Sequence, residues 1–182
     1  MLDNIYQEVS RSRDIVKGLL EFARETEFCL KSVPLHLVVQ RAVSLVSSEV
    51  PAGVNIVTDI PPDIELPLDG QRFQEVLLNL MINAIQAITP PGTITLAARR
   101  DPAAPLAVLE VRDTGSGIPR EHMGRIFDPF FTLKETGTGL GLAVVFGIIK
   151  KHGGSIGVES EPGRGTCFTV RLPLAGVAGG AL

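Results

Sequence analysis

The first 25 residues of the chain contain no proline and repeat apolar or small residues every three or four positions, which predicts an amphipathic helix. The stripe consists of Ile5, Val9, Ser12, Val16, Leu19 and Ala23. A helix with one apolar stripe needs a partner helix to bury it. The pattern breaks at "TEFCLKSVP", so we expect a linker over residues 30–34.

Beyond Pro34 the hydrophobic pattern alternates between helical and strand periods. It predicts helices over residues 35–50, 69–88, 120–127 and 141–153, and strands over 54–60, 64–68, 92–99, 106–113, 154–160 and 165–173. Asp69 is the expected N-cap of the second helix, whose predicted core positions are Phe73, Val76, Leu77, Leu80, Ile82 and Ile85. The order of the elements favours an α+β fold, in which a mixed sheet carries helices on one face. Residues 175–182 are small and read as a flexible tail.

The composition argues against several classes of function. With 182 residues, 45% of them hydrophobic, the chain can form one sizeable domain and an appendage. A net charge of −3 without a basic cluster argues against a nucleic-acid partner. The sequence has no apolar run long enough to span a membrane and no signal peptide. Cys29 and Cys167 lie far apart and suggest two free thiols, so we expect a cytoplasmic protein.

The stretch "KETGTGLGL", residues 134–142, places three glycines immediately before a predicted helix. It is not a Walker loop, because no Gly-Lys pair occurs in the chain, and its glycine spacing does not fit a dinucleotide fingerprint. A glycine-rich loop at a helix N-terminus offers unpaired backbone N–H groups to an anion such as phosphate. A plain turn before a helix would also explain this stretch alone.

Two further features carry candidate chemistry. Asp113 ends a predicted strand and is followed by Gly115 and Gly117, so its carboxylate could accept hydrogen bonds from the amine of a base, or simply form an Asx-turn. Asn79 and Asn83 lie one turn apart on the predicted helix 69–88. Their neutral oxygens would suit Mg²⁺ that also binds substrate phosphates, or they are amides on the helix surface.

Together these segments resemble the ATP-binding catalytic domain of sensor histidine kinases, within the GHKL ATPase superfamily. Five stretches match in family order over about residues 35–173: "NLMINA" the N box, "DTGSG" the G1 box, "FDPFF" the F box, "GTGLGL" the G2 box, and "GRGTCF" the last strand. The details look most like the nitrogen-regulation type. The resemblance implies a Bergerat-type two-layer α/β sandwich over residues 35–174, preceded over residues 1–29 by the second helix of a dimerisation domain.

The resemblance also implies roles at the base end of the site. Asp113 would hold the adenine amine, with Gly115 beside it, and Gly117 would let the ring approach. Ile118 and Ile85 would line the ring's pocket. Thr166 would add a hydroxyl, reached through water.

At the phosphate end, the resemblance implies that Asn83 ligates Mg²⁺ with Asn79 in support, and that Gln86 touches phosphate or ribose. Lys134 would sit in a mobile lid and meet the γ-phosphate. The backbone of the loop and helix start would cradle the phosphates. This cradle comprises Gly137, Thr138, Gly139, Leu140, Gly141 and Leu142.

Asn79 decides the expected chemistry. Hydrolysing relatives carry a glutamate at this position as a general base for water, and an amide cannot take a proton. Glu75, one turn earlier, reads as a surface or capping residue. The expected reaction is therefore transfer of the γ-phosphate to a histidine, in a two-component signal-transduction protein whose phosphate passes to a response regulator.

The accepting helix itself has no match in the sequence, because His36, His122 and His152 lie in unsuitable contexts. We therefore expect a fragment of a homodimeric kinase that binds Mg·ATP without labelling itself. Two alternatives remain open at this stage. One is a serine kinase of the anti-sigma-factor type, which lacks a dimerisation helix, and the other is a nucleotide-binding interaction module without enzymatic activity.

Overall fold

The computed structural model of the chain describes residues 28–134 and 137–174. The helix expected within residues 1–29 and the tail expected over 175–182 lie almost wholly outside this description. Within the described part of the chain, none of the helices is both long and apolar enough to cross a membrane.

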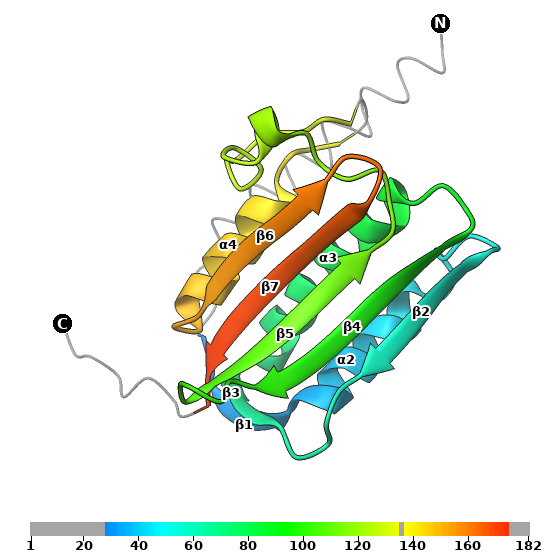
Figure 1. The fold of residues 1–182 in the computed structure, drawn as a ribbon. Coiled ribbons are helices and arrows are strands. Elements are labelled where there is room, and N and C mark those ends of the chain that lie inside the picture. The colour runs from blue at the N-terminus through cyan, green and yellow to red at the C-terminus, as the bar shows by residue number, and fades with distance from the viewer. Residues whose placement is uncertain (1–27, 135–136, 175–182) are drawn as a thin grey trace, which may run out of the picture.

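A five-stranded mixed sheet forms one layer of the fold (Figure 1). Its strands are β2 (Val54–Asp59), β4 (Gly92–Arg100), β5 (Leu106–Asp113), β7 (Gly165–Pro173) and β6 (Ser155–Glu161), in this spatial order. β2 pairs with β4 in parallel, and the other neighbouring pairs are antiparallel. The predicted mixed sheet is confirmed.

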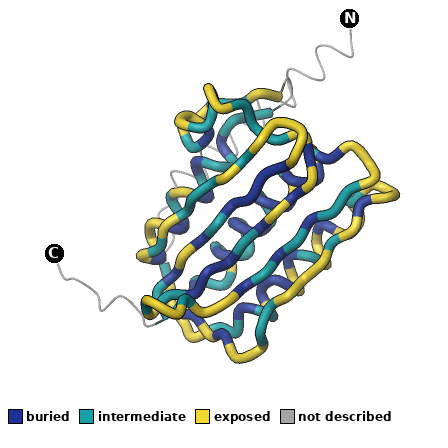
Figure 2. The backbone as a smooth tube through the Cα atoms, viewed as in Figure 1, coloured by how far each residue is buried: buried dark blue, intermediate teal, exposed yellow. Residues whose placement is uncertain are grey.

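Three helices form the second layer and cover a single face of the sheet (Figure 1). They are α2 (Leu35–Val46), α3 (Gly70–Ala87) and α4 (Gly141–Lys151). Alternation along the strands turns one set of side chains towards the helices, so that Ile94 and Leu96 of β4 and Leu109 of β5 join the core. Burial is accordingly greatest along the central strands and the inner sides of the helices (Figure 2).

The linker predicted over residues 30–34 is replaced by a strand. β1 (Lys31–Pro34) pairs antiparallel with β3 (Glu65–Leu68) in a separate two-stranded sheet. Ser32 Oγ donates to Glu65 Oε2 at 2.8 Å, and Leu35 N donates to Ile64 O at 2.9 Å. Because the partner strand lies more than thirty positions away in the sequence, the local pattern around Pro34 did not reveal this pairing.

Helix α3 begins as predicted, because the side chain of Asp69 accepts a hydrogen bond from Arg72 N at 3.1 Å. One predicted core position is wrong: Ile82 is 40% exposed, whereas its neighbour Met81 is fully buried. The helix predicted over 120–127 is only a short 3₁₀ turn, η1 (Arg120–His122). Helix α2 also ends at Val46, four residues before the predicted end.

His152 ties the end of α4 to the start of α3. The side chain is buried, its Nε2 accepts from Asp69 N at 3.1 Å, and its Nδ1 lies 2.8 Å from Ile148 O. Its ring also packs edge-on against Phe28 and Phe73. Burial lowers the pKa of His152, which keeps the imidazole neutral and able to accept from the backbone. This contact connects two helices that each carry part of the candidate site.

Candidate functional site: a pocket between α3, α4 and the ends of β5 and β7

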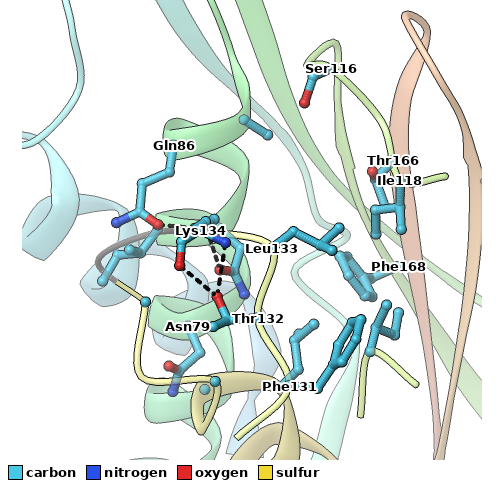
Figure 3. A pocket seen from close by; sticks show the side chains of 18 of the residues that line it. Asn79, Gln86, Ser116, Ile118, Phe131, Thr132, Leu133, Lys134, Thr166 and Phe168 are labelled. Carbon is cyan, nitrogen blue, oxygen red and sulfur yellow. Dashed lines mark hydrogen bonds between the residues drawn. The ribbon is translucent and has the colours of Figure 1, made fainter. Parts of the chain in front are cut away.

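A cavity of about 480 Å³ opens beside α3, and it brings together residues that are far apart in the sequence (Figure 3). Thirteen of the sixteen candidate site residues line it. The helix and strand side contributes Asn79, Asn83, Gln86, Asp113, Gly117, Ile118 and Thr166. The glycine-rich side contributes Lys134, Gly137, Thr138, Gly139, Gly141 and Leu142.

Asp113 is buried at the end of β5, and the described residues donate hydrogen bonds to only one of its oxygens. Oδ1 accepts from Gly115 N at 2.7 Å and from Thr166 N at 3.3 Å. The first bond is the Asx-turn considered above, so the turn and a ligand contact are compatible. Oδ2 accepts no hydrogen bond from the described residues, which leaves an acceptor for a donor in the pocket. Burial raises the pKa of Asp113, and the two backbone bonds partly oppose this shift.

Ser160 orients the hydroxyl of Thr166, which lies opposite Asp113. Ser160 Oγ lies 2.9 Å from Thr166 Oγ1, accepts from Ile118 N at 2.8 Å, and contacts Gly165 O at 3.0 Å. All three contacts are satisfied when Ser160 donates to the carbonyl and Thr166 donates to Ser160. The lone pairs of Thr166 then remain available to a donor from a ligand or a water.

Four of the residues that the sequence suggested for the site have other neighbours than expected. Gly115 does not line the pocket, because it packs on α3, where a Cβ would lie 2.6 Å from Ala87 O. Ile85 and Leu140 are buried in the protein and do not line the pocket either. Gly117 does line it, but its φ of +71° and its contact with the backbone of Glu161 are what require a glycine. The turn between β6 and β7, rather than a ring, occupies the space that a side chain would need.

The opposite end of the pocket is built on one face of α3. Asn79 Nδ2 donates to Glu75 O at 3.0 Å, which holds the amide against its own helix. Glu75 itself pairs with Arg72 at 3.2 Å and does not line the pocket. Lys134 Nζ reaches α3 from the glycine-rich side and donates to Asn83 Oδ1 at 2.9 Å and to Gln86 Oε1 at 2.6 Å (Figure 3). Partial burial of the ammonium in the pocket lowers the pKa of Lys134.

Tight backbone contacts hold the glycine-rich side in place. Phe130 N donates to Gly139 O at 2.9 Å, Gly139 has a φ of +70°, and a Cβ on Gly139 would lie 2.4 Å from the carbonyl carbon of Phe130. Helix α4 then begins at Gly141, where no side chain of the described residues caps the first turn. A Cβ at Gly141 would lie 2.8 Å from Asn79 Oδ1, so this glycine lets the helix start approach α3. The arrangement is suited to an anion.

Several lining residues were not predicted. Ile82 could have been found, since it shares a helical face with Asn79 and Gln86 at spacings of three and four residues. Ala87 and Phe168 also lie on a predicted helix and a predicted strand, and they were not selected. The other apolar lining residues, Ile126, Phe131 and Leu133, come from irregular segments whose side-chain directions the local pattern does not fix. Ser116 and Thr132 add hydroxyl groups to the lining.

The donor set fits a magnesium ion that takes most of its ligands from a nucleotide and water. Among the described residues, no cluster of three or more His, Cys, Asp or Glu side chains could hold a metal. The ammonium of Lys134 donates hydrogen bonds to two amide oxygens, so this end of the pocket offers neutral oxygens to a cation. Asn83 Oδ1 and Gln86 Oε1 are neutral oxygens of the kind that could join a metal that also binds phosphates.

Comparison with known proteins identifies relatives of this arrangement. A family model described as "Histidine kinase-, DNA gyrase B-, and HSP90-like ATPase" matches residues 68–176. The chain is 38% identical over 172 residues to the sensor histidine kinase ZraS of Escherichia coli K12, covering 92% of this chain and 36% of ZraS. It is 37% identical to the sensory histidine kinase/phosphatase NtrB of Salmonella typhimurium, covering 93% of this chain and 51% of NtrB. The chain therefore spans about a third to a half of these relatives.

Solved structures agree with the sequence relatives. The catalytic domain of the histidine kinase ThkA superposes with a TM-score of 0.69 at 30% identity, covering 79% of this chain and 95% of that domain. ThkA in complex with the response regulator protein TrrA superposes with a TM-score of 0.77 at 29% identity, covering 95% of this chain and 50% of ThkA. The two-layer fold matches that of histidine kinase catalytic domains.

Proposed function

The chain belongs to the family of histidine kinase-, DNA gyrase B- and HSP90-like ATPases, and from this premise we propose that it binds Mg·ATP and presents the γ-phosphate to a histidine of an acceptor helix. The activity would be that of a protein histidine kinase in two-component signalling. The anti-sigma-type serine kinase and the non-enzymatic module are not favoured, because the named relatives are sensor histidine kinases.

The observation that carries this proposal is the lack of a general base where the phosphates would lie. Among the described residues that line the pocket, Asp113 is the single carboxylate, and it sits buried at the other end. Asn79 cannot accept a proton, and the Glu75 carboxylate is held by Arg72 outside the pocket. A site of this kind retains ATP without activating water, so the γ-phosphate remains available to a stronger nucleophile.

The residues at the base end have roles that follow from their hydrogen bonding. The unpaired Oδ2 of Asp113 would accept the exocyclic amine of adenine, and the Thr166 hydroxyl would accept a second donor directly or through water. Ile118 would provide apolar surface for the ring. A buried carboxylate that lacks a second partner binds a donor well, because the alternative leaves it desolvated and unpaired.

At the other end, Asn83 would hold Mg²⁺ and α4 would direct its first backbone N–H groups at the phosphates. The metal, when bound, would neutralise phosphate charge. Lys134 would complete the site with a positive charge near the terminal phosphate.

The partners are part of the same proposal. The ThkA structure contains a bound response regulator, which supports a response regulator as the phosphate acceptor downstream of this kinase. We further propose that residues 1–29 form the second helix of a dimerisation domain in a homodimeric, cytoplasmic kinase region. The amphipathic stripe in the sequence supports this assignment.

The test has two parts. Calorimetry should detect ATP binding in the micromolar range or weaker, about −8 kcal/mol at best, with dependence on Mg²⁺ that the Asn83→Ala variant loses. Labelled ATP should then give no phosphate release and no self-labelling, but an acid-labile label on an acceptor helix supplied in trans. Steady release of phosphate to water would contradict the assignment, and an acid-stable label would favour the serine kinase.

A further inference from the structure

Lys134 occupies a defined position although its side chain is partly open to solvent. Its ammonium makes two hydrogen bonds to α3, to Asn83 Oδ1 at 2.9 Å and to Gln86 Oε1 at 2.6 Å. The backbone around it is also held, because Lys134 N donates to Thr132 Oγ1 at 3.1 Å and Lys134 O accepts from Gly137 N at 3.3 Å. The lysine is thus placed by its own turn and bound by amide oxygens, with no carboxylate as its counter-ion among the described residues.

Lys134 is also the single cationic side chain among the described residues that line the pocket. The rigid parts of the site on α3, β5 and β7 supply amides, hydroxyls and one carboxylate. A nucleotide carries several negative charges on its phosphates, so the placement of this one cation weighs heavily on affinity. In the structure the Lys134 ammonium already donates hydrogen bonds to amide oxygens on α3.

A magnesium ion and an ammonium on the same amide oxygen repel each other. Magnesium binds oxygen ligands at about 2.0–2.1 Å, and an ammonium held on the same atom would lie within strong repulsion of the ion. Lys134 must therefore leave Asn83 before that residue can act as a metal ligand. The cost of breaking both amide contacts has to be offset by a new partner for the ammonium.

We propose that Lys134 occupies the cation position of the nucleotide-free site, and that its transfer from Asn83 and Gln86 to the terminal phosphate makes the site prefer a nucleoside triphosphate over a diphosphate. This inference rests on the function proposed above. A triphosphate gives the displaced ammonium a third phosphate group to bind. A diphosphate lacks that group, so its binding breaks the amide contacts of Lys134 without providing the ammonium with an equivalent new partner.

Substitution of Lys134 by methionine separates the two contributions. In Lys134→Met the amide oxygens are free, so we expect Mg·ADP to bind about threefold more tightly, in keeping with contacts that are partly exposed to water. Mg·ATP loses its partner for the terminal phosphate and should bind about threefold to tenfold more weakly. The ratio of the ADP to the ATP dissociation constant should therefore fall by about tenfold or more.

The measurement is calorimetric titration of the whole chain with each nucleotide and Mg²⁺, supported by the thermal midpoint of each variant. Lys150→Met is the matched control, because Lys150 lies on α4 over the ring of Phe146 and does not line the pocket. It should leave both affinities within a factor of two. Lys134→Arg keeps the charge and should retain a preference for ATP.

The outcomes are distinguishable from failure of the proposed function. If the wild-type chain binds neither nucleotide, both the proposed function and the transfer of Lys134 to the phosphate are wrong. If the wild-type chain binds both nucleotides, two results would overturn the transfer of Lys134 but not the nucleotide site. In one, Lys134→Met changes both dissociation constants by the same factor; in the other, the variant binds Mg·ADP more weakly.

Discussion

Replacing Asp113 with asparagine tests whether the base end of the pocket recognises an amine. The variant keeps the shape of the side chain, and its carbonyl oxygen can still accept from Gly115 N and Thr166 N as Oδ1 does at 2.7 and 3.3 Å. The local turn should therefore persist. What changes is the second oxygen, which becomes an NH₂ group that donates a hydrogen bond and no longer accepts one.

The expected loss follows from leaving a donor of the ligand without an acceptor inside a buried site. Such a mismatch costs about 1–3 kcal/mol, which corresponds to a rise of about 5- to 150-fold in the dissociation constant of Mg·ATP. Protein stability should not fall in parallel. Burial raises the pKa of Asp113, so the fold disfavours its charged form at neutral pH, and the neutral amide should leave the free energy of unfolding unchanged or slightly higher.

The assay is calorimetry with two purine nucleotides on the wild-type chain and on Asp113→Asn. GTP serves as the control ligand, because guanine carries a carbonyl oxygen where adenine carries the amine, and the new NH₂ group can donate to it. We expect ATP to lose affinity and GTP to lose none or to gain. Equal losses for both nucleotides, or unchanged ATP affinity in a variant with the wild-type thermal midpoint, would refute the reasoning.

Three further predictions concern the scaffold. Because the folded-state pKa of His152 lies below its ordinary value of about 6.5, the unfolded chain binds more protons in that window, and the free energy of unfolding should fall as pH decreases below about 6.5. His152→Leu should lose about 1–3 kcal/mol at pH 8, where the imidazole bonds are intact, and should show a flatter pH dependence in denaturant titrations. Gly139→Ala should cost at least about 1–2 kcal/mol locally from the positive φ and should weaken nucleotide binding, whereas Gly124→Ala, with open space around it, should not change binding. Phe73→Ala should lower the free energy of unfolding by about 3–5 kcal/mol, measured by urea denaturation, since the side chain is fully buried in the core; a loss under about 1 kcal/mol would contradict its place there.

The sequence predicted strands and helices correctly where a clear hydrophobic period coincided with a local signal such as a helix cap. Helix α3 is the clearest case, with an acidic cap at Asp69 and an apolar stripe that the structure buries. The strand β1 was missed because its partner β3 lies far along the chain, and pairing over such a distance leaves no local periodicity. Residues 31–34 were consequently assigned to a linker, whereas Lys31–Pro34 form a strand.

For the candidate site, residue types were easier to anticipate than the reasons for them. Asp113 and the α3 amides were found because carboxylates and amides are unusual in apolar strands and helices. The glycines were also found, but Gly115 and Gly117 are required by contacts with Ala87 and Glu161 of the protein itself. Such close backbone contacts depend on the packing of distant turns, which spacing along the chain does not encode.

Helix α3 explains why the fold and the pocket depend on each other. The same helix buries Phe73, Val76 and Leu80 against the sheet and directs Asn79, Asn83 and Gln86 into the pocket. A helix held so firmly can present neutral polar groups with little motion, and these suffice for hydrogen bonds and for a metal ligand. The positive charge comes instead from Lys134 on a separate turn, where it binds the α3 amides in the structure. The Lys134 ammonium and the α3 amides belong to different elements of the fold. The ammonium can therefore move from the amides to a phosphate without disturbing the packing of the core, which makes the proposed exchange of partners physically feasible.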